Sequence, residues 1–567
     1  MKKLNIDAVV VPTADPHLSE YIPEHYKLRE ALSGFTGSSG DLVVTMDKAG
    51  LWTDGRYYIQ AEKELSGRKI ELFKASEKDT PKIYKFLCDE LMEGSVVGVD
   101  GRLFSKKTLD KLITELDKKK ISVDTSFDAS AVWENRPEMP KDKLFLFSEE
   151  YTGESLCEKV SKLRAEIKKD GFTHYLTSMP ECIMWLLNVR GNDVRYTPVA
   201  LSYMLVSDNF IRLYIDKEKA MDVSDYLAEN GVTVCDCLSV YSDLSALDEG
   251  CYLAVDFDNA NYNLVKSINC AHKDRKDFIE NLKCIKTNTE IENIKKSYIK
   301  ENTALVKSFY EIYNSDNLTE FDVVNIIEKY RRELPGYYSP SFDTIAAFGK
   351  NAAMVHYSPS EKNSGKVGDN GLLLIDTGGQ YTDGTTDTTR TLVLGEITKE
   401  EKESLTLVLK GNIAIATLVF PNGKTGKDID AIAREPLWKK GLDYKHGTGH
   451  GIGFFLGVHE GPQRISPVCN VEFRENMTLS DEPGVYIENG YGIRIENHLC
   501  VKKYNDEFLC FEVLNYCPIG TKGIDESLLD RDETRWLNGY NEKCCELLKP
   551  HLAKEEYEWL KTYTAKI

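Results

Sequence analysis

Runs of apolar residues separated by polar, helix-like segments fill the first half of the chain. "DAVVV" (7–11) and "GDLVVTM" (40–46) are short runs rich in β-branched residues and predict buried strands, while "DGRYYIQAEKELSG" (54–67) predicts a helix that ends at a glycine. Farther along, "THYLTS" (173–178) predicts another strand, and "PECIMWLLNVRG" (180–191) predicts a helix that runs into a loop.

Both segments pass from a strand, through a helix, to a glycine-bearing loop and then into a hairpin. The loops are "SGFTGSSGD" (33–41) and "NVRGNDV" (188–194), and the second hairpin joins "PVALSYMLV" (198–206) to "FIRLYID" (210–216). We therefore predict a duplicated α/β module. The charged, proline-bearing stretch "VWENRPEMPKDK" (132–143) is typical of a linker.

A larger third segment opens with a long amphipathic helix near Thr289. Its apolar positions fall mostly on one helical face: Ile291, Ile294, Tyr298, Leu305, Phe309 and Ile312. A second helix is predicted over residues 318–334, where Thr319 and Asp322 are spaced as a capping box. Two more helices are predicted over residues 401–420 and 427–440, and the last should be kinked or broken at Pro436.

Strand-like runs lie between these helices. They are "GLLLID" (371–376), "TTRTLVL" (388–394), "MTLS" (477–480), "GVYIE" (484–488) and "IRIENHLCV" (493–501). The mixture predicts an α+β domain of the size of a catalytic domain. From about Ser527 to Ile567 the chain is charged and helical in pattern, with Trp536 and Trp559 as anchors.

Composition and charge narrow the class of protein. The 567 residues are 41% hydrophobic and 29% charged, which is typical of a globular protein with ample core. The net charge of −19 and the pI of about 5.2 argue against nucleic acid and anionic membranes, because both partners are polyanions. No apolar run is long enough to span a bilayer, and "MKKLNIDAVVVPTADP" lacks the pattern of a signal peptide. The fourteen scattered cysteines include no CxxC pair and indicate reduced thiols in a cytoplasmic protein.

The stretch "HGTGHGIGFFLGVHEGP" (446–462) combines glycines with three histidines, His446, His450 and His459. It suits either a phosphate-binding glycine loop or a bed of metal-site histidines. The phosphate interpretation requires a strand before the glycines and a helix after them. The preceding residues, "KKGLDYK" (439–445), lack the apolar pattern of a buried strand. This favours the histidine interpretation.

Acidic residues occupy the ends of several predicted strands in the same segment. Asp376 ends one apolar strand and Asp387 begins the next, with Asp383 in the glycine-rich turn between them. Glu482 follows a further strand, and Glu496 lies inside "GIRIENHLCV", on the face that it shares with Arg494. A separate apolar run ends at His356.

Each of these acids also has an ordinary interpretation, as a turn residue or as a salt-bridge partner such as Arg494 for Glu496. Taken together they place too many like charges in one region, because buried carboxylates repel one another. Two divalent cations would balance four carboxylates. Oxygen-rich ligands with one imidazole suit Mn²⁺ or a similar ion, and such a pair of ions generates hydroxide near neutral pH.

At these residues the sequence resembles the cytosolic three-domain aminopeptidase P (Xaa-Pro aminopeptidase) family of "pita-bread" metallopeptidases. The motifs "HYSP", "DTGGQYTDGTTDTTRT", "HGTGHGIGFFLGVHEGP" and "DEPGVYIENGYGIRIEN" match in order and spacing, and "WLNGYN" (536–541) is similar to the family's C-terminal extension. The resemblance covers nearly the whole chain. It implies two creatinase-like α/β modules, residues 1–138 and 139–285, followed by a pita-bread catalytic domain over residues 286–567.

The resemblance also implies the roles of individual residues. Asp376 would bind the first ion, Asp387 and Glu496 would bridge both, and His450 and Glu482 would bind the second. In the family a metal-bridging hydroxide attacks the Xaa-Pro peptide bond, and the residue at the Glu482 position is also proposed to shuttle the proton. His356 and His459 would hold substrate and the oxyanion, and His446 would lie near the P1′ side.

The activity that follows is release of the N-terminal residue from peptides with proline in second position, by a cytoplasmic homodimer with two Mn²⁺ ions. Two alternatives remain: a proline dipeptidase of the same fold, and a metal-free binding protein of that fold. The paired N-terminal modules favour the aminopeptidase over the dipeptidase. The presence of all five ligand residues disfavours the binding protein.

Overall fold

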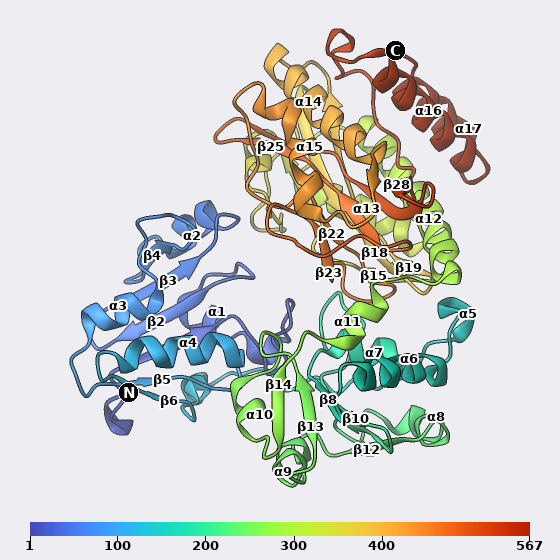
Figure 1. The fold of residues 1–567 in the computed structure, drawn as a ribbon. Coiled ribbons are helices and arrows are strands. Elements are labelled where there is room, and N and C mark those ends of the chain that lie inside the picture. Colours follow the sequence, from blue (N-terminus) through green and yellow to red (C-terminus); the bar gives the residue numbers. More distant parts are fainter. The chain divides into compact units, whose positions relative to one another are not determined.

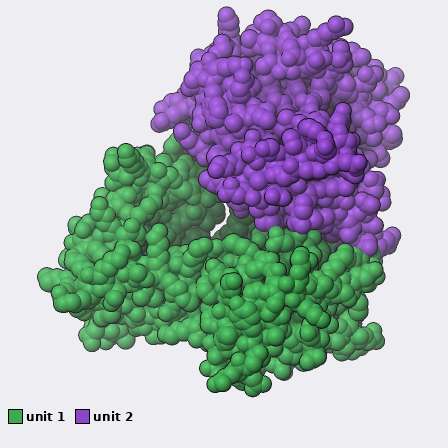
Figure 2. Space-filling model, viewed as in Figure 1, with its two compact units in different colours: residues 1–149, 154–282 green, residues 150–153, 283–567 purple.

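The structure is a computed structural model that describes residues 1–567. The chain forms two compact units, which Figure 2 colours separately: unit 1 is residues 1–149 and 154–282, and unit 2 is residues 150–153 and 283–567. No helix in either unit combines the length and the apolar character needed to cross a membrane.

Unit 1 begins with a six-stranded sheet in the order β4-β3-β2-β1-β5-β6. Its strands are β1 (Ala8–Pro12), β2 (Asp41–Thr45), β3 (Ala49–Thr53), β4 (Glu71–Lys74), β5 (Val96–Gly98) and β6 (Ser122–Asp124). β1 is antiparallel to β2 and parallel to β5, while β3 is parallel to β4. The runs "DAVVV" and "GDLVVTM" therefore form strands, as predicted, and the structure shows that they pair with each other.

Alternate residues of a strand point to opposite faces of its sheet, and helices pack on both faces of this one. Ala8 and Val10 of β1 pack in one core with α3 (Ile83–Glu90) and α4 (Lys106–Asp117). Val9 and Val11 pack in the other core with α1 (Leu28–Ser33) and α2 (Tyr58–Leu65).

A second six-stranded sheet in unit 1 repeats this topology, with the order β12-β11-β10-β8-β13-β14. Its strands are β8 (His174–Thr177), β10 (Tyr203–Ser207), β11 (Ile211–Tyr214), β12 (Val232–Cys235), β13 (Tyr252–Val255) and β14 (Ala271–Asp274). Its helices are α6 (Leu156–Lys169), α7 (Pro180–Leu187), α8 (Ser224–Glu229), α9 (Ser239–Ser245) and α10 (Tyr262–Lys266). β8 is antiparallel to β10 and parallel to β13, as β1 is to β2 and β5. The predicted duplication is confirmed by this shared connectivity.

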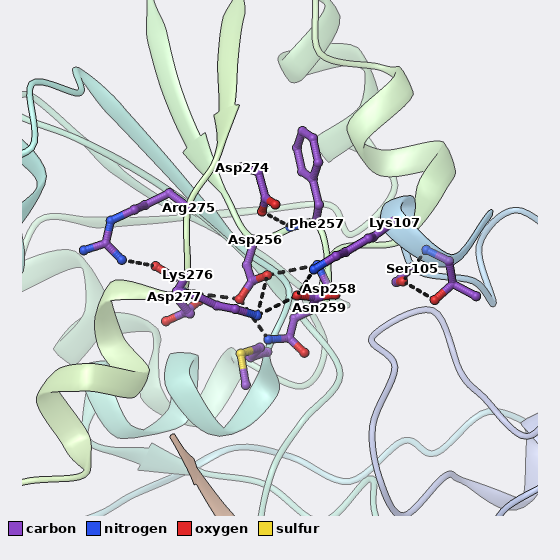
Figure 3. Close-up of polar contacts among 12 residues, drawn as sticks. Ser105, Lys107, Asp256, Phe257, Asp258, Asn259, Asp274, Arg275, Lys276 and Asp277 are labelled. Atoms are coloured by element: carbon purple, nitrogen blue, oxygen red, sulfur yellow. Dashed lines mark hydrogen bonds and ion pairs between the residues drawn. The ribbon is translucent and has the colours of Figure 1, made fainter. Parts of the chain in front are cut away.

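The two modules meet at a polar joint inside unit 1, drawn in Figure 3. Lys107, at the start of α4 in the first module, donates to Asp258 of the second at 3.0 Å, and Lys276 donates to the same carboxylate at 2.7 Å. The backbone N–H of Lys107 also donates to the carbonyl of Phe257. Residues 133–144 contain neither helix nor strand, and β7 (Phe145–Leu146) then pairs with β9 (Val189–Arg190).

Unit 2 contains six longer helices, which carry the labels α12 to α17 in Figure 1. They are α12 (Asn288–Tyr313), α13 (Glu320–Arg332), α14 (Lys399–Ala416), α15 (Gly426–Trp438), α16 (Arg531–Leu548) and α17 (Lys554–Tyr563). Along the chain, two short helices, α5 (Glu149–Thr152) and α11 (Phe278–Lys283), each span a boundary between the units. All six apolar positions predicted for α12 are buried, and Thr319 and Asp322 form the predicted capping box.

The strands of unit 2 form several small sheets, chiefly β16-β17-β20 and β21-β28-β27-β24. The strands are β15 (Tyr337–Pro340), β16 (Ile345–Phe348), β17 (Gly371–Thr377), β18 (Gly379–Tyr381), β19 (Gly384–Thr385), β20 (Thr388–Leu394), β21 (Val419–Pro421), β22 (Gly449–Gly451), β23 (Glu460–Ile465), β24 (Thr478–Asp481), β25 (Gly484–Ile487), β26 (Tyr491–Arg494), β27 (Asn497–Lys503) and β28 (Phe508–Val513). Leu373 and Ile375 of β17 pack on α12 and α13, whereas Leu372 packs in a core with α14 and α16. Helices therefore cover this sheet on both sides as well.

Two local predictions are wrong. Helix α15 is not broken at Pro436 but continues through it and ends two residues later, at Trp438. Glu496 does not lie within a strand: β26 ends at Arg494 and β27 begins at Asn497, so that Ile495 and Glu496 form the junction between them. The tail is helical as predicted, and Trp559 of α17 stacks on Tyr563 and lies against Tyr310 of α12.

Candidate metal centre

Asp376 and Asp387 lie at the same end of the antiparallel pair β17 and β20. Asp376 is the penultimate residue of β17 and pairs in register with Thr389, while Asp387 immediately precedes β20. The small hairpin of β18 and β19 closes the connection between them. Asp383, in that hairpin, accepts two hydrogen bonds from Lys300 at 2.6 and 2.8 Å and so has a cationic partner of its own.

Glu482 and Glu496 also lie side by side, because they flank an antiparallel pair. Asp481 at the end of β24 pairs in register with Asn497 at the start of β27, which places Glu482 and Glu496 just beyond the paired ends. The backbone N–H of Glu482 donates to the carbonyl of Thr448 at 2.7 Å, which ties Glu482 to the segment that leads into β22.

His450, the central residue of β22, joins these two pairs of acids. Its Nε2 atom lies 3.5 Å from Oδ2 of Asp387 and 3.4 Å from Oε1 of Glu482. Asp387, His450 and Glu496 each offer one ligand atom, and these atoms lie within 4.8 Å of one another. Asp387 and Glu496 are 4% and 1% exposed, so that two carboxylates and an imidazole converge away from bulk water.

Asp376 connects to the same cluster through Arg494. Nη2 of Arg494 lies 2.5 Å from Oδ2 of Asp376, and its Nε donates to the hydroxyl of Thr389 at 3.2 Å. That hydroxyl donates in turn to Oε2 of Glu496 at 2.8 Å. Arg494 therefore pairs with Asp376 and reaches Glu496 only through Thr389, a different arrangement from the direct Arg494–Glu496 salt bridge that was the ordinary interpretation of the sequence.

The carboxylates of this cluster perturb one another. Burial raises the pKa of Glu496 to about 7, and the nearby charge of Asp376 adds to the shift. Burial, reinforced by the charge of Glu496, also raises the pKa values of Asp387 and Glu482 well above their usual range. Arg494 alone does not neutralise these carboxylates, so their like charges repel one another near neutral pH.

Two observations show that the cluster fits divalent cations. Nδ1 of His450 lies 2.9 Å from the carbonyl oxygen of Gly451, so that this nitrogen carries the proton and Nε2 presents a lone pair to the two carboxylates. In addition, Oδ1 of Asp376 and Oε1 of Glu496 are buried and accept no hydrogen bond. An imidazole lone pair that faces carboxylates, next to buried oxygens with no hydrogen bond, is expected where these atoms bind a cation. It is not expected where they hydrogen-bond to one another.

The polar joint of unit 1 (Figure 3) provides a contrast. Its acids are satisfied within the protein: Asp258 accepts from Lys107 and Lys276, and Asp256 accepts from the amide of Asn259 at 3.1 Å. These carboxylates thus have donors within the protein, as in a structural contact, whereas the cluster in unit 2 leaves carboxylate oxygens without a donor.

Two further predicted histidines, His459 and His356, lie in segments next to those that carry the ligand candidates. His459, in the bend just before β23, is partly buried, and its ring centroid lies 4.4 Å from that of His450 at an interplanar angle of 89°. His356 is partly buried in the turn after the 3-10 helix η5 (Gly349–Ala353), which packs against β17 and β26. Of those two strands, β17 contains Asp376, and β26 ends two residues before Glu496.

His446 belongs to a hydrogen-bonded chain that includes a residue missed by the sequence analysis, Tyr486. Nδ1 of His446 faces the carbonyl of Gly447 at 2.7 Å, so that its Nε2 accepts from the hydroxyl of Tyr486 at 2.9 Å. The same hydroxyl accepts from Nη1 of Arg494 at 2.6 Å. Burial lowers the pKa of His446 to about 3, which keeps the imidazole neutral.

The backbone around these histidines excludes the phosphate-loop interpretation. β22 is followed by an irregular segment and then by β23, with which it pairs, and no helix begins after the glycines. Close packing explains two of the glycines: a Cβ on Gly449 would lie 1.9 Å from the carbonyl of Ser480, and one on Gly451 would lie 2.4 Å from the carbonyl of Glu460. These glycines bring β22 close to its neighbours.

The chain belongs to metallopeptidase family M24. The profile of that family matches residues 292–503, and the profile of the C-terminal region of peptidase M24 matches residues 507–567. Two profiles of the creatinase/prolidase N-terminal domain match residues 1–131 and 135–290. Each of the two related modules of unit 1 thus has its own family assignment.

Named relatives and solved structures agree with this assignment. A probable Xaa-Pro aminopeptidase P of Sordaria macrospora is 39% identical over 96% of this chain and 93% of its own length. The crystal structure of X-prolyl aminopeptidase from Caenorhabditis elegans, described as a cytosolic enzyme with a di-nuclear active site, is 33% identical, with a TM-score of 0.94 over 99% of this chain and 95% of that one. A prolidase from Pyrococcus horikoshii is 26% identical with a TM-score of 0.52, but it covers only 65% of this chain.

Proposed function

We propose that this chain is a metal-dependent aminopeptidase that releases the N-terminal residue from peptides with proline in second position. The observation that carries the proposal is the position of Nε2 of His450, 3.5 Å from Asp387 and 3.4 Å from Glu482, beside the unsatisfied oxygens of Asp376 and Glu496. Membership of family M24 and the close likeness to an X-prolyl aminopeptidase with a di-nuclear active site support the reaction.

Five residues would hold two divalent ions: Asp376, Asp387, His450, Glu482 and Glu496. By the family resemblance Asp387 and Glu496 would bridge the pair, and the ligand atoms of these two carboxylates and of His450 lie within 4.8 Å of one another. Bound ions would polarise the scissile carbonyl and activate a water molecule near neutral pH. We propose Mn²⁺ for both, since four carboxylates and one imidazole form a mainly oxygen donor set.

The protein side chains then have separate tasks. Glu482, at the open side of the cluster and 18% exposed in its side chain, would accept the proton of the attacking water and pass it to the leaving amine. His459 and His356 would donate to the substrate and to the developing oxyanion. Arg494 holds Asp376 and, through Tyr486, fixes the orientation of the neutral His446.

Recognition of proline would fall to the region around His459. The phenylalanines of the stretch are not open to a ligand: Phe454 and Phe455 are at most 1% exposed, and Phe455 packs edge-on against Tyr338. Within residues 448–460, His450 and His459 are partly buried and all other residues are buried. We therefore place the proline ring against these imidazoles and not against the apolar run.

The organisation of the whole chain belongs to the same proposal. We propose domain boundaries at 138/139 and 285/286, close to the gaps between the matched profiles and to the division at Leu282/Lys283. We also propose a cytoplasmic homodimer. The fourteen cysteines, none of which forms a disulfide, support a reducing compartment.

The test compares peptides that separate the aminopeptidase from its alternatives. Arg-Pro-Pro should lose its arginine, Arg-Ala-Pro should react far more slowly, and N-acetylated Arg-Pro-Pro should not react at all. Preference for the dipeptide Gly-Pro would instead establish a proline dipeptidase. Absence of hydrolysis with every peptide, at full metal loading, would support the non-catalytic alternative.

A further inference from the structure

The C-terminal helix α16 inserts one hydroxyl group behind the strands that carry the candidate ligands. This is Tyr540, within "WLNGYN", a residue that is only 5% exposed. Its hydroxyl accepts from Nη2 of Arg390 at 2.8 Å and has three acceptors within reach: Oδ1 of Asn497 at 3.0 Å and the carbonyls of Asn515 and Cys517 at 2.9 and 2.8 Å. A buried hydroxyl with this many partners is a junction of hydrogen bonds and not a packing residue alone.

Arg390 connects Tyr540 to the backbone of Glu496. Nη1 of Arg390 donates to the carbonyl of Glu496 at 2.5 Å and to that of Thr389 at 2.7 Å, and its Nη2 donates to Oδ1 of Asn497 at 2.9 Å. The guanidinium is 2% exposed, and all its hydrogen-bond acceptors are neutral. Each neutral acceptor therefore matters, because a buried cation left short of partners is costly.

The network extends from Asn497 to the segment of Glu482. The amide of Asn497 donates to Oδ1 of Asn412 in α14 at 3.2 Å, and the amide of Asn412 donates to the carbonyl of Asp481 at 2.8 Å. Asp481 precedes Glu482, as Asn497 follows Glu496. The two glutamate segments are thus joined through buried amides as well as through strand pairing.

A third branch reaches the segment of Asp387. Tyr540 contacts the carbonyl of Asn515, whose side-chain amide donates to the hydroxyl of Thr388 at 2.9 Å. Thr388 directly follows Asp387. Three of the five proposed ligands are therefore adjacent in sequence to residues of one network, and Tyr540 is the member supplied by the C-terminal extension.

We propose that Tyr540 is a positioning residue for the metal centre: its hydroxyl, through Arg390 and the Asn497–Asn412 pair, fixes the backbone that carries Glu496 and Glu482. The proposal depends on the proposed function in one respect, because it takes Glu482 and Glu496 to be metal ligands. Without the hydroxyl, Arg390 loses an acceptor and Asn497 loses a donor, so that the junction Ile495–Glu496 is less rigidly held. Groups behind a metal ligand typically contribute 10- to 100-fold in metal affinity or activity.

The experiment uses the full-length variant Tyr540→Phe, which keeps the ring and its packing. The matched control is Tyr516→Phe, because Tyr516 stacks on Tyr540 with ring centroids 5.5 Å apart and its hydroxyl takes no part in the network. Calorimetric titration of metal-stripped protein with Mn²⁺ gives the dissociation constants, steady-state hydrolysis of Arg-Pro-Pro gives kcat and KM separately, and thermal unfolding checks the fold. A second variant, Asn412→Leu, breaks the branch to Asp481 with a side chain of similar size.

We expect Tyr540→Phe to weaken Mn²⁺ binding and to lower kcat by about 10- to 100-fold each, with little change in KM, while Tyr516→Phe stays within about twofold of the wild type. Dissociation constants and kcat of Tyr540→Phe within twofold of the wild type would overturn the proposal. If Tyr540→Phe does not fold, the Mn²⁺ affinity of Asn412→Leu decides in the same way. If the wild type binds Mn²⁺ but hydrolyses no peptide, the proposed function fails, and the comparison of affinities still tests the positioning role.

Discussion

Lys286 and Glu460 form an ion pair in which both side chains are almost fully buried, and Lys283 contacts the second carboxylate oxygen of Glu460 at 2.8 Å. Glu460 opens β23 and directly follows His459. Burial alone would raise the pKa of Glu460, but the charges of Lys283 and Lys286 outweigh it and hold this pKa below its usual range. The start of unit 2 is thereby fastened to the segment that carries His459.

This clamp predicts a large loss of stability in Glu460→Gln. Removing the carboxylate takes the charge of Glu460 away from two buried lysines, and breaking such a buried pair typically costs about 3–5 kcal/mol. Urea unfolding of the variant and of the wild type measures the difference. The control is Glu138→Gln, which removes the partner of Lys141 from an exposed pair and should leave the unfolding midpoint unchanged. Equal midpoints for Glu460→Gln and wild type would show that the clamp contributes little.

The stability of metal-stripped protein should fall as pH rises from about 4.5 to about 7. The pKa of Glu496 is raised from 4.5 to about 7 in the folded state, so its ionisation is resisted there while the unfolded chain ionises freely. The stabilisation is complete below the unfolded value and is lost as pH passes the folded value. Asp387 and Glu482, whose pKa values are also raised, extend the loss to higher pH. Thermal unfolding at several pH values, with and without Mn²⁺, measures this; a stripped protein that becomes more stable across this range would contradict it.

Asp387→Asn and Glu482→Ala should each abolish hydrolysis of Arg-Pro-Pro and leave the protein folded. Four ligand residues and a large core remain, and loss of one carboxylate relieves repulsion in the cluster. Stripped Asp387→Asn should therefore be at least as heat-stable as the stripped wild type, although its activity is lost. Full activity of either variant at unchanged metal content would falsify the assignment.

His356→Ala and His459→Ala should lower kcat by about 10²–10³ while both ions stay bound. The proposed role of these imidazoles is to donate hydrogen bonds to the substrate and the oxyanion, and loss of one such donor has effects of this size. Steady-state kinetics and metal analysis of the same preparations separate the two effects. Loss of an ion in either variant would make that histidine a ligand.

The sequence predicted most of the strands of this structure but few of its side-chain contacts. The duplicated module was predictable because four of its strands are short buried runs that can be read directly from the sequence. "DAVVV" and "GDLVVTM" become β1 and β2, and their counterparts "THYLTS" and "PVALSYMLV" become β8 and β10. The break before Asn497 was not, since "IRIENHLCV" alternates as one strand while the chain turns at Ile495 and Glu496. A periodic pattern does not record where a strand changes its pairing partner.

The candidate site shows the same limit. Acids at strand ends and glycines next to histidines indicated the cluster, because those residue types are costly in a core without cations. The partners of Arg494 and the role of Tyr486 were hidden, since they depend on contacts across 118 and 40 residues of sequence. Tyr540 was visible only as part of "WLNGYN", and no local pattern connects it to Arg390, 150 residues away in sequence.

The most direct measurement is the number of Mn²⁺ ions bound per chain, determined together with activity in one titration of metal-stripped protein. We expect two ions per chain, with hydrolysis of Arg-Pro-Pro appearing as the site fills and absent from the stripped protein. Binding of no ion, or undiminished hydrolysis by protein shown to be free of metal, would contradict a two-ion site built from Asp376, Asp387, His450, Glu482 and Glu496.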